Sequence, residues 1–202
     1  AKLESASGLS DTDGEDAFAF NAFSTHTEDD YDSALIAATG QARVLDSRSW
    51  TVTRGDDGSL SGTAGAGLTL AQVEGLSSKT GAALFATGVE GTLVHNTYAS
   101  VAKLQTVTGS SRTVGHDAFH FNTFTTDTTD TYAVIHGQAR VVSSSSTTDT
   151  VGADTSHSRT VAVVTNTYNA DTAKLETAQG RSDTDGEDAF AFNAFSTHTE
   201  DD

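Results

Sequence analysis

The sequence predicts an all-β fold of tandem immunoglobulin-like β-sandwich modules, with short helices only in the insertions. Two observations lead to this fold class. The chain repeats its own opening segment, which is typical of a modular array. Its apolar residues also fall into short runs rich in Val, Thr and aromatic side chains, separated by Gly, Asn, Asp and Ser. Several short strands in a module of about 100 residues are typical of a β-sandwich.

The repeat appears three times. Residues 1–30 recur at 173–202, where Thr177, Gln179 and Arg181 replace the only three residues that differ. A more divergent copy begins at Ala102. Such self-similarity over long spacings indicates that the same structural unit is used repeatedly along the chain.

The spacing of the copies sets the expected domain organisation. The equivalent glycines Gly14, Gly115 and Gly186 are separated by 101 and 71 residues, so a long and a short module make up a unit of 172 residues. The long module carries extra residues around Ser47 to Gly81, and insertions of this kind are best tolerated in loops. We expect a long β module at 1–101, a short β module at 102–172, and at 173–202 the start of a further repeat that acts as a donor strand or inter-module segment.

Strands are expected wherever Val, Thr and aromatic residues alternate with partial period two. These runs are Gln41–Leu45, Ser49–Arg54, Thr92–Tyr98, Tyr132–Ile135, Gln138–Val142 and Arg159–Tyr168. Helix is expected only at Leu68–Leu76 and Ser33–Ala38, in or beside the insertions.

Each copy of the repeat contains three Phe residues in the pattern Phe-x-Phe-Asn-x-Phe. We interpret Ala17–Phe23 as a strand with a bulge or an end at Asn21, because the alternation slips by one residue there. Burying a Phe side chain contributes roughly 1.5–3 kcal/mol, so these residues are expected to anchor the core or to insert into a neighbouring module during assembly. They are Phe18, Phe20, Phe23, Phe119, Phe121, Phe124, Phe190, Phe192 and Phe195.

The composition excludes several classes of function. The chain has 11 basic and 28 acidic residues, which gives a formal charge of −17 and repels both nucleic acid and anionic lipid. It has no Cys, so disulfides, thiolate nucleophiles and thiolate zinc sites are excluded. No apolar run approaches the ~20 residues that cross a bilayer, so we expect no membrane insertion.

Calcium is the only cofactor that the sequence suggests. Alternating carboxylates around a Gly are the oxygen ligands that a hard cation prefers, and the divergent copy has lost most of them. A solvated acidic turn is the competing interpretation. The candidate ligands are Asp11, Asp13 and Asp16, with their equivalents Asp183, Asp185 and Asp188.

No catalytic motif is present, and we expect no enzyme activity. His116 and His120 lie four residues apart, and on a continuous strand their side chains would be about 13 Å apart, too far to share a metal. His26 exchanges with Asp127 between copies, which indicates a surface residue. An enzyme would require a constellation in the insertion, around Trp50, Arg54, Asp56 and Asp57.

The Thr-rich and Ser-rich stretches are interpreted as solvated strand and loop. O-glycosylation and a surface that faces ice or sugar are the alternatives. A regular Thr ladder that would suit ice binding is expected to require a short repeating spacing along the chain, which is missing.

Taken together, these features favour a non-catalytic structural subunit of an extracellular fibre or filament, with copies of itself as partners. Two alternatives fit the same composition and repeat. One is a calcium-stiffened stalk or binding array of a large surface adhesin, and the other is a viral tail or spike fibre.

Overall fold

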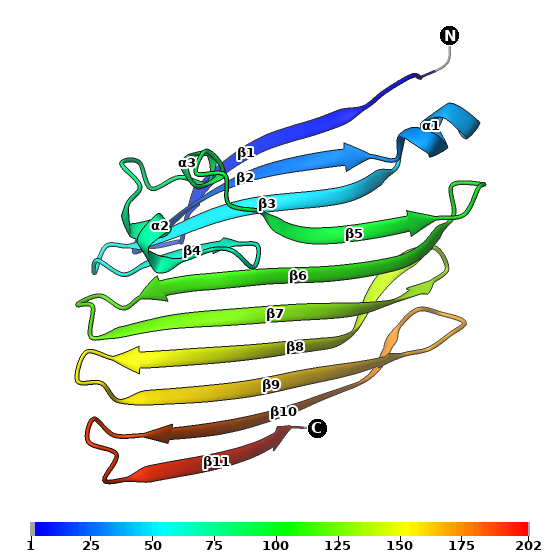
Figure 1. Ribbon diagram of the computed structural model, residues 1–202. Coiled ribbons are helices and arrows are strands. Elements are labelled where there is room, and N and C mark those ends of the chain that lie inside the picture. Colours follow the sequence, from blue (N-terminus) through cyan, green and yellow to red (C-terminus); the bar gives the residue numbers. More distant parts are fainter. Residues whose placement is uncertain (1–2, 202) are drawn as a thin grey trace.

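The computed structural model describes residues 3–201 and has one large antiparallel sheet of eleven strands. Neighbouring strands follow the order β1-β2-β3-β4-β6-β7-β8-β9-β10-β11, and β5 pairs with β3 and β6 beside this path (Figure 1). The strands are β1 (Ser7–Glu15), β2 (Asn21–Tyr31), β3 (Val44–Gly55), β4 (Leu60–Ala64), β5 (Thr92–Tyr98), β6 (Leu104–His116), β7 (Asn122–Ile135), β8 (Gln138–Gly152), β9 (His157–Tyr168), β10 (Leu175–Glu187) and β11 (Ala194–Asp201). The expectation of an all-β chain is confirmed.

The strands do not form the two packed layers of a sandwich. All eleven described strands belong to one sheet, and each neighbouring pair is hydrogen-bonded. The reason lies in the side chains: β7 and β8 carry Ser, Thr and Asp on both faces, so they offer no continuous apolar face for a second sheet to bury. The immunoglobulin-like arrangement is therefore not seen in the described residues.

Three short helices lie beside the sheet in the part of the chain that the structure describes. Helix α1 (Ser33–Thr39) begins behind the N-cap Asp32 and ends at Gly40, whose φ of 74° suits a glycine. Helix α2 (Leu70–Glu74) has a capping box between Thr69 and Gln72. Helix α3 (Gly81–Phe85) begins behind Thr80. The sequence predicts α1 and α2 but not α3. α2 lies within the longer apolar run Leu68–Leu76, whereas α3 begins with Gly81, a poor helix former.

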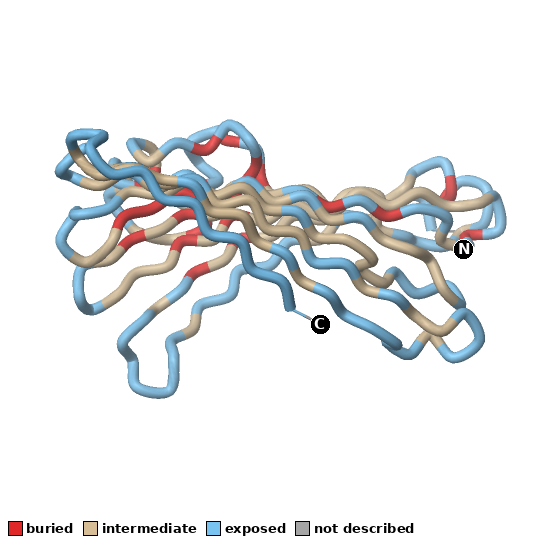
Figure 2. The backbone as a smooth tube through the Cα atoms, turned by 90° about the horizontal axis from the view of Figure 1, so that it is seen from below, coloured by how far each residue is buried: buried red, intermediate tan, exposed pale blue. Residues whose placement is uncertain are grey.

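The core lies where α2 and α3 cover one face of β3, β4 and β6. Val52, Val73 and Leu84 are completely buried there, and the Trp50 indole donates a hydrogen bond of 2.8 Å to the Val89 carbonyl. Figure 2 shows that buried residues are few elsewhere and that the strand leading to the C-terminus is exposed along its length. The apolar cluster comprises Trp50, Val52, Leu60, Ala64, Leu68, Val73, Leu84, Val89 and Val114.

The repeated Phe residues do not form this core, and the expectation that they anchor it is wrong. Their side chains lie at or beside hairpin turns, where most of them remain in contact with solvent. Exposed members are Phe18, Phe20, Phe23, Phe119, Phe121, Phe190, Phe192 and Phe195. Phe124 is half-buried, and it is also outside the core cluster.

The chain from Ala17 to Phe23 begins as a turn and not as a strand. β1 ends at Glu15 and β2 begins at Asn21. The Asp16 carboxylate accepts hydrogen bonds from the amides of Phe18 (3.2 Å) and Phe20 (2.8 Å) and from Asn21 Nδ2 (2.8 Å). These bonds compete with strand extension and close the hairpin, which explains the slip in the alternation at Asn21.

The boundaries of the sequence modules fall in hairpin turns of the continuous sheet. Ala102 and Ala173 begin two copies of the repeat, and both have a positive φ, of 61° and 55°. The first lies between β5 and β6 and the second between β9 and β10. Strands of the long module pair with β6 of the short module, so the sheet crosses the boundary at 102 without interruption.

Among the described residues, no helix combines the length and the apolar character needed to span a membrane.

Candidate functional site: the repeated hairpins at the sheet edges

The near-identical copies of the repeat form hairpins at opposite edges of the sheet. The β1–β2 hairpin lies at one edge and the β10–β11 hairpin at the other (Figure 1). They have the same register: Gly14 faces Phe23 in the first, and Gly186 faces Phe195 in the second. The middle copy, β6–β7, keeps it with Gly115 opposite Phe124. A Cβ at any of these glycines would overlap the Phe ring, so the Gly–Phe pair fixes the register.

A cross-strand pair of a carboxylate with a basic side chain occupies the same place in all three hairpins. His26 Nδ1 lies 2.8 Å from Asp11 Oδ1, and His198 Nδ1 lies 2.5 Å from Asp183 Oδ1. In the middle copy, Arg112 donates two hydrogen bonds of 2.7 Å to Asp127. Asp127 thus stands at the position of His26, and Arg112 stands at the position of Asp11 on the neighbouring strand. The two changes together preserve an attractive pair.

These pairs shift the pKa values of the exposed members. The hydrogen bond from His198 lowers the pKa of Asp183, and the hydrogen bonds to Asp183 and Glu200 raise the pKa of His198. The hydrogen bonds from Arg112 lower the pKa of Asp127. In each case the partner stabilises the charged form.

The two edge hairpins differ in what covers them. On β2, Ser24 accepts a hydrogen bond of 3.2 Å from the Gly81 amide at the start of α3, and the His26 ring stacks on Phe85 at 4.6 Å. The His26 side chain is only 6% exposed, whereas its equivalent His198 on β11 is 53% exposed. The interpretation of His26 as a surface residue is wrong, because α3 covers it. β11 presents the same residues as β2 without a helix over them.

Each of the two terminal strands of the sheet, β1 and β11, has one edge without a neighbouring strand in the described chain, and the equivalent edge is paired in the other copy of the hairpin. β10 is the copy of β1. The edge of β10 that faces away from β11 pairs with β9, whereas the equivalent edge of β1, which faces away from β2, has no neighbouring strand among the described residues. The edge of β2 that faces away from β1 pairs with β3, whereas the equivalent edge of β11, which faces away from β10, has no neighbouring strand in the described chain. Each end of the sheet therefore carries a strand whose copy is paired elsewhere in the molecule.

A ladder of ten Thr residues crosses the sheet, one from each strand of the main path. The strand registers place Thr12, Thr25, Thr51, Thr63, Thr113, Thr126, Thr148, Thr160, Thr184 and Thr197 side by side. It lies on the face away from α2 and α3, because Thr51 separates the core residues Trp50 and Val52 on β3. The expectation that such a ladder needs a short spacing along the chain is wrong, because it is built across strands.

The hydroxyl groups of this ladder form hydrogen bonds between every second pair of neighbouring strands. This alternation is expected for the closely spaced residue pairs of an antiparallel sheet. Four pairs have Oγ1 atoms 2.9 Å apart: Thr25 with Thr51, Thr63 with Thr113, Thr126 with Thr148, and Thr160 with Thr184. Thr197 is the copy of Thr25, and within the described part of the chain no strand brings it a partner equivalent to Thr51.

The candidate calcium ligands do not converge. Asp11 and Asp13 lie along β1, and Asp16 lies in the turn with its carboxylate occupied by protein donors. Five residues of extended strand separate Asp11 from Asp16 by roughly 16 Å, so they cannot coordinate one ion. Asp183, Asp185 and Asp188 repeat this arrangement on β10, where Asp188 accepts from Asn193 Nδ2 at 2.6 Å.

A cluster that the sequence does not predict lies at the junction of α2 with the β6–β7 turn. Glu74, His116 and His120 have potential ligand atoms within 4.8 Å of one another, and theirs is the one such group of three found in the described chain. The prediction that the two His residues lie too far apart is wrong, because β6 ends at His116. The turn then returns the chain, and the His rings stack with centroids 3.6 Å apart.

Comparison of the chain with family models, with curated proteins and with solved structures gives no match.

Proposed function

We propose that this chain is a structural, non-catalytic subunit of an extracellular fibre built from tandem β-rich repeats, in which a single sheet passes from one repeat to the next. The observation that carries the proposal is the pair of edge hairpins. They share sequence and register, and they lie at opposite ends of the sheet. Each has one edge without a neighbouring strand in the described chain, and the equivalent edge of the other hairpin pairs with a strand.

The strand directions are compatible with continuation. Ten strands follow one another along the main path, and every neighbouring pair is antiparallel. The first and last strands therefore run in opposite directions, so a further strand that follows the order of the repeat meets β11 in the antiparallel sense. Unpaired edges favour association, because their backbone groups gain hydrogen bonds when another strand is added.

The side chains of β11 also match a specific neighbour. β11 has the same sequence as β2 from Ala22 to Asp29, so a strand equivalent to β3 would meet the residues that β3 meets on β2. Ser196 and His198 would then be covered by a helix equivalent to α3, and Thr197 would gain a hydroxyl partner equivalent to Thr51. The three positions that differ between the copies all precede β2 and β11.

This junction can form between separate chains by exchange of hairpins. The β10–β11 hairpin of one copy would replace the β1–β2 hairpin of another on β3, and it would make nearly the same interactions there because the two hairpins are nearly identical. The charge of −17 opposes close approach of two copies, and about 1 M salt shortens the Debye length to roughly 3 Å and removes most of this repulsion.

Engineered cysteines test the junction directly, because the chain has none of its own. The variant Thr51→Cys/Thr197→Cys places the two thiols at a closely spaced pair only when β11 of one copy lies beside β3 of another. After refolding at high salt and oxidation, we expect a covalent ladder on a non-reducing gel, and filaments of uniform width by negative-stain electron microscopy.

The matched control is Thr51→Cys/Ser196→Cys. Ser196 precedes Thr197 and lies on the opposite face of β11, so the register forbids the disulfide and only monomers are expected. Equal cross-linking of both variants would indicate random collision and contradict the proposal. Dispersed compact particles of the unmodified chain under all refolding conditions, with no ladder from the Thr197 variant, would contradict it as well.

A further inference from the structure

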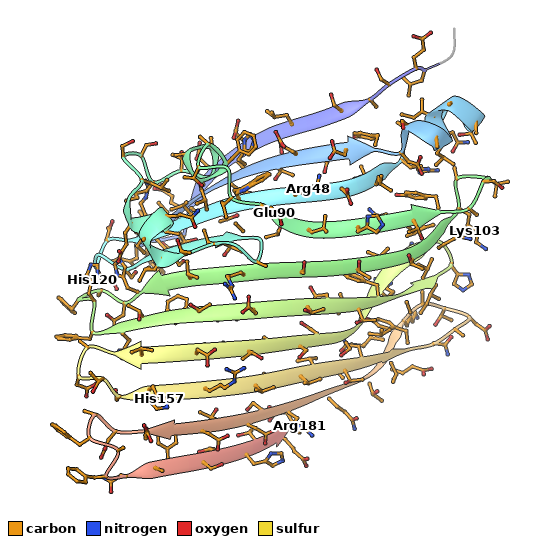
Figure 3. All side chains as sticks on the ribbon, viewed as in Figure 1. Arg48, Glu90, Lys103, His120, His157 and Arg181 are labelled. Atoms are coloured by element: carbon orange, nitrogen blue, oxygen red, sulfur yellow. The ribbon has the colours of Figure 1, made fainter. Side chains whose placement is uncertain are left out.

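The Glu74, His116 and His120 cluster joins two parts of the chain that are distant in sequence. Glu74 is the last residue of α2, in the insertion of the long module. His116 is the last residue of β6, and His120 lies in the following turn with a φ of 56°. Figure 3 shows His120 at the end of the sheet beside α2. The His120 Nδ1 atom lies 3.8 Å from Glu74 Oε1.

We propose that these three side chains bind a divalent transition-metal ion of the zinc class, which links the insertion to the β6–β7 hairpin. Two imidazoles and a carboxylate form a mixed nitrogen and oxygen ligand set that suits zinc, copper or nickel and does not suit calcium, which prefers oxygen alone. This site is independent of the junction between repeats.

The hydrogen bonding of His116 prepares it as a ligand. Its side chain is buried, and Nδ1 lies 2.8 Å from the Asp117 carbonyl oxygen. A carbonyl only accepts, so Nδ1 donates this hydrogen bond, and in the neutral imidazole Nε2 is then the nitrogen with the free lone pair. Metal-binding histidines commonly donate their other ring N–H to a backbone carbonyl in this way, which fixes the orientation of the ring.

The other two ligands have room to close on the ion. The side chains of His120 and Glu74 are 61% and 40% exposed, so both can rotate without disturbing the core. Tetrahedral zinc with bonds of about 2.0–2.1 Å separates its ligand atoms by roughly 3.3 Å, compared with a present maximum of 4.8 Å. The site opens into a pocket of about 600 Å³ whose lining includes Arg54 and Lys79, so water can occupy a fourth position.

Lys79, which lines the same pocket, is held by the backbone at the end of α2. Lys79 Nζ donates hydrogen bonds to the carbonyls of Val73 and Glu74 at the end of α2, and these bonds hold it to the helix backbone. Its charge weakens the attraction for a cation, but the Glu74 carboxylate offsets this charge within the same cluster.

Comparison of the three hairpins within the chain supports the assignment. Where the middle copy has His116 and His120, the first copy has Glu15 and Ala19, and the third has Glu187 and Ala191. Both alanines keep the positive φ, at 57° and 53°, so the turn forms without histidine. Both histidines therefore occur only in the hairpin that faces Glu74, which a general structural need of the turn does not explain.

Zinc chloride titrated into the full chain by isothermal calorimetry tests the site. We expect one zinc ion to bind per chain. The zinc affinity of His120→Ala should be at least about 10-fold lower, since even the loss of a group that only hydrogen-bonds to a metal ligand lowers metal affinity 10- to 100-fold. Because Ala stands at this position in the other two hairpins, the variant is expected to fold. The control His157→Ala removes an exposed histidine from the start of β9 and should bind zinc as the unmodified chain does.

Nuclear magnetic resonance supplies a second measurement. Zinc should shift the imidazole signals of His116 and His120 and should leave those of His136 and His157 unchanged. Absence of binding to the unmodified chain, or equal affinity in His120→Ala, would overturn the proposal. An equal loss of zinc affinity in His157→Ala would also overturn it, because zinc binding would then be a general property of exposed histidines.

Discussion

The contact between α3 and β2 depends on the absence of a side chain at Gly81, and the substitution Gly81→Ala tests it. A Cβ at this position would overlap the backbone of Trp50 and His26, which cannot move aside without breaking the sheet. The helix would have to move away from β2 and lose the hydrogen bond from the Gly81 amide to Ser24.

The magnitude follows from three contributions. Overpacking costs roughly 1–3 kcal/mol, and leaving a buried hydrogen-bonding pair unmade costs roughly 1–3 kcal/mol. Replacing Gly by Ala in a helix contributes up to about 1 kcal/mol in the opposite direction. We therefore expect Gly81→Ala to lower the free energy of unfolding by about 1–5 kcal/mol, since the steric and hydrogen-bond costs exceed the gain in helix propensity.

Urea unfolding followed by fluorescence provides the assay, because Trp50 is the one tryptophan of the chain and lies against Phe85 of α3. The matched control is Gly67→Ala, whose Cβ would meet nothing closer than 3.9 Å and whose φ is not positive. It should change the free energy of unfolding by less than about 1 kcal/mol. Equal stability of Gly81→Ala and the unmodified chain would refute the steric argument.

Two further predictions concern charge. The raised pKa of His198 means that its pair with Asp183 stabilises the β10–β11 hairpin fully below the unfolded pKa of about 6.5 and loses this contribution as the pH rises through the folded pKa. Hydrogen exchange, corrected for the intrinsic rate, should show declining protection of β11 from about pH 6 to 9, and His198→Gln should abolish the trend. The Arg112–Asp127 pair of the middle hairpin stays charged over this range and serves as the internal control. Calcium and its chelation should leave the melting temperature unchanged, because the six candidate carboxylates do not converge; a rise of several degrees with calcium would instead favour the calcium-stiffened stalk.

Much of the secondary structure could be predicted from local sequence. The run Thr92–Tyr98 coincides with β5, and Arg159–Tyr168 lies within β9. α1 begins at the expected Ser33. These elements have strong local signals, such as β-branched residues in strands and an Asp or Thr cap before a helix. The turn at Asp16 resembles a strand in sequence because Phe and Ala alternate as on a pleated surface, while the hydrogen bonds that close it depend on the folded geometry.

The candidate sites could be predicted only in part. The repeat identifies the edge hairpins as a special feature, but not their location at opposite ends of one sheet. The His cluster is hidden from sequence reasoning because a strand that continued through His116 would keep the two imidazoles apart, and β6 in fact ends there. The only signal in the sequence is the occurrence of both histidines in the middle copy alone, at positions that hold Glu and Ala in the others.

The sequence by itself determined the β class, the repeat and its period, because these depend on residue type and local spacing. The tertiary structure alone decided that the strands form one sheet, that ten Thr residues align across it, and that Glu74 meets two histidines from another module. Alignment across strands depends on register, and register follows from contacts such as Gly14 with Phe23 between strands and not from any spacing within one.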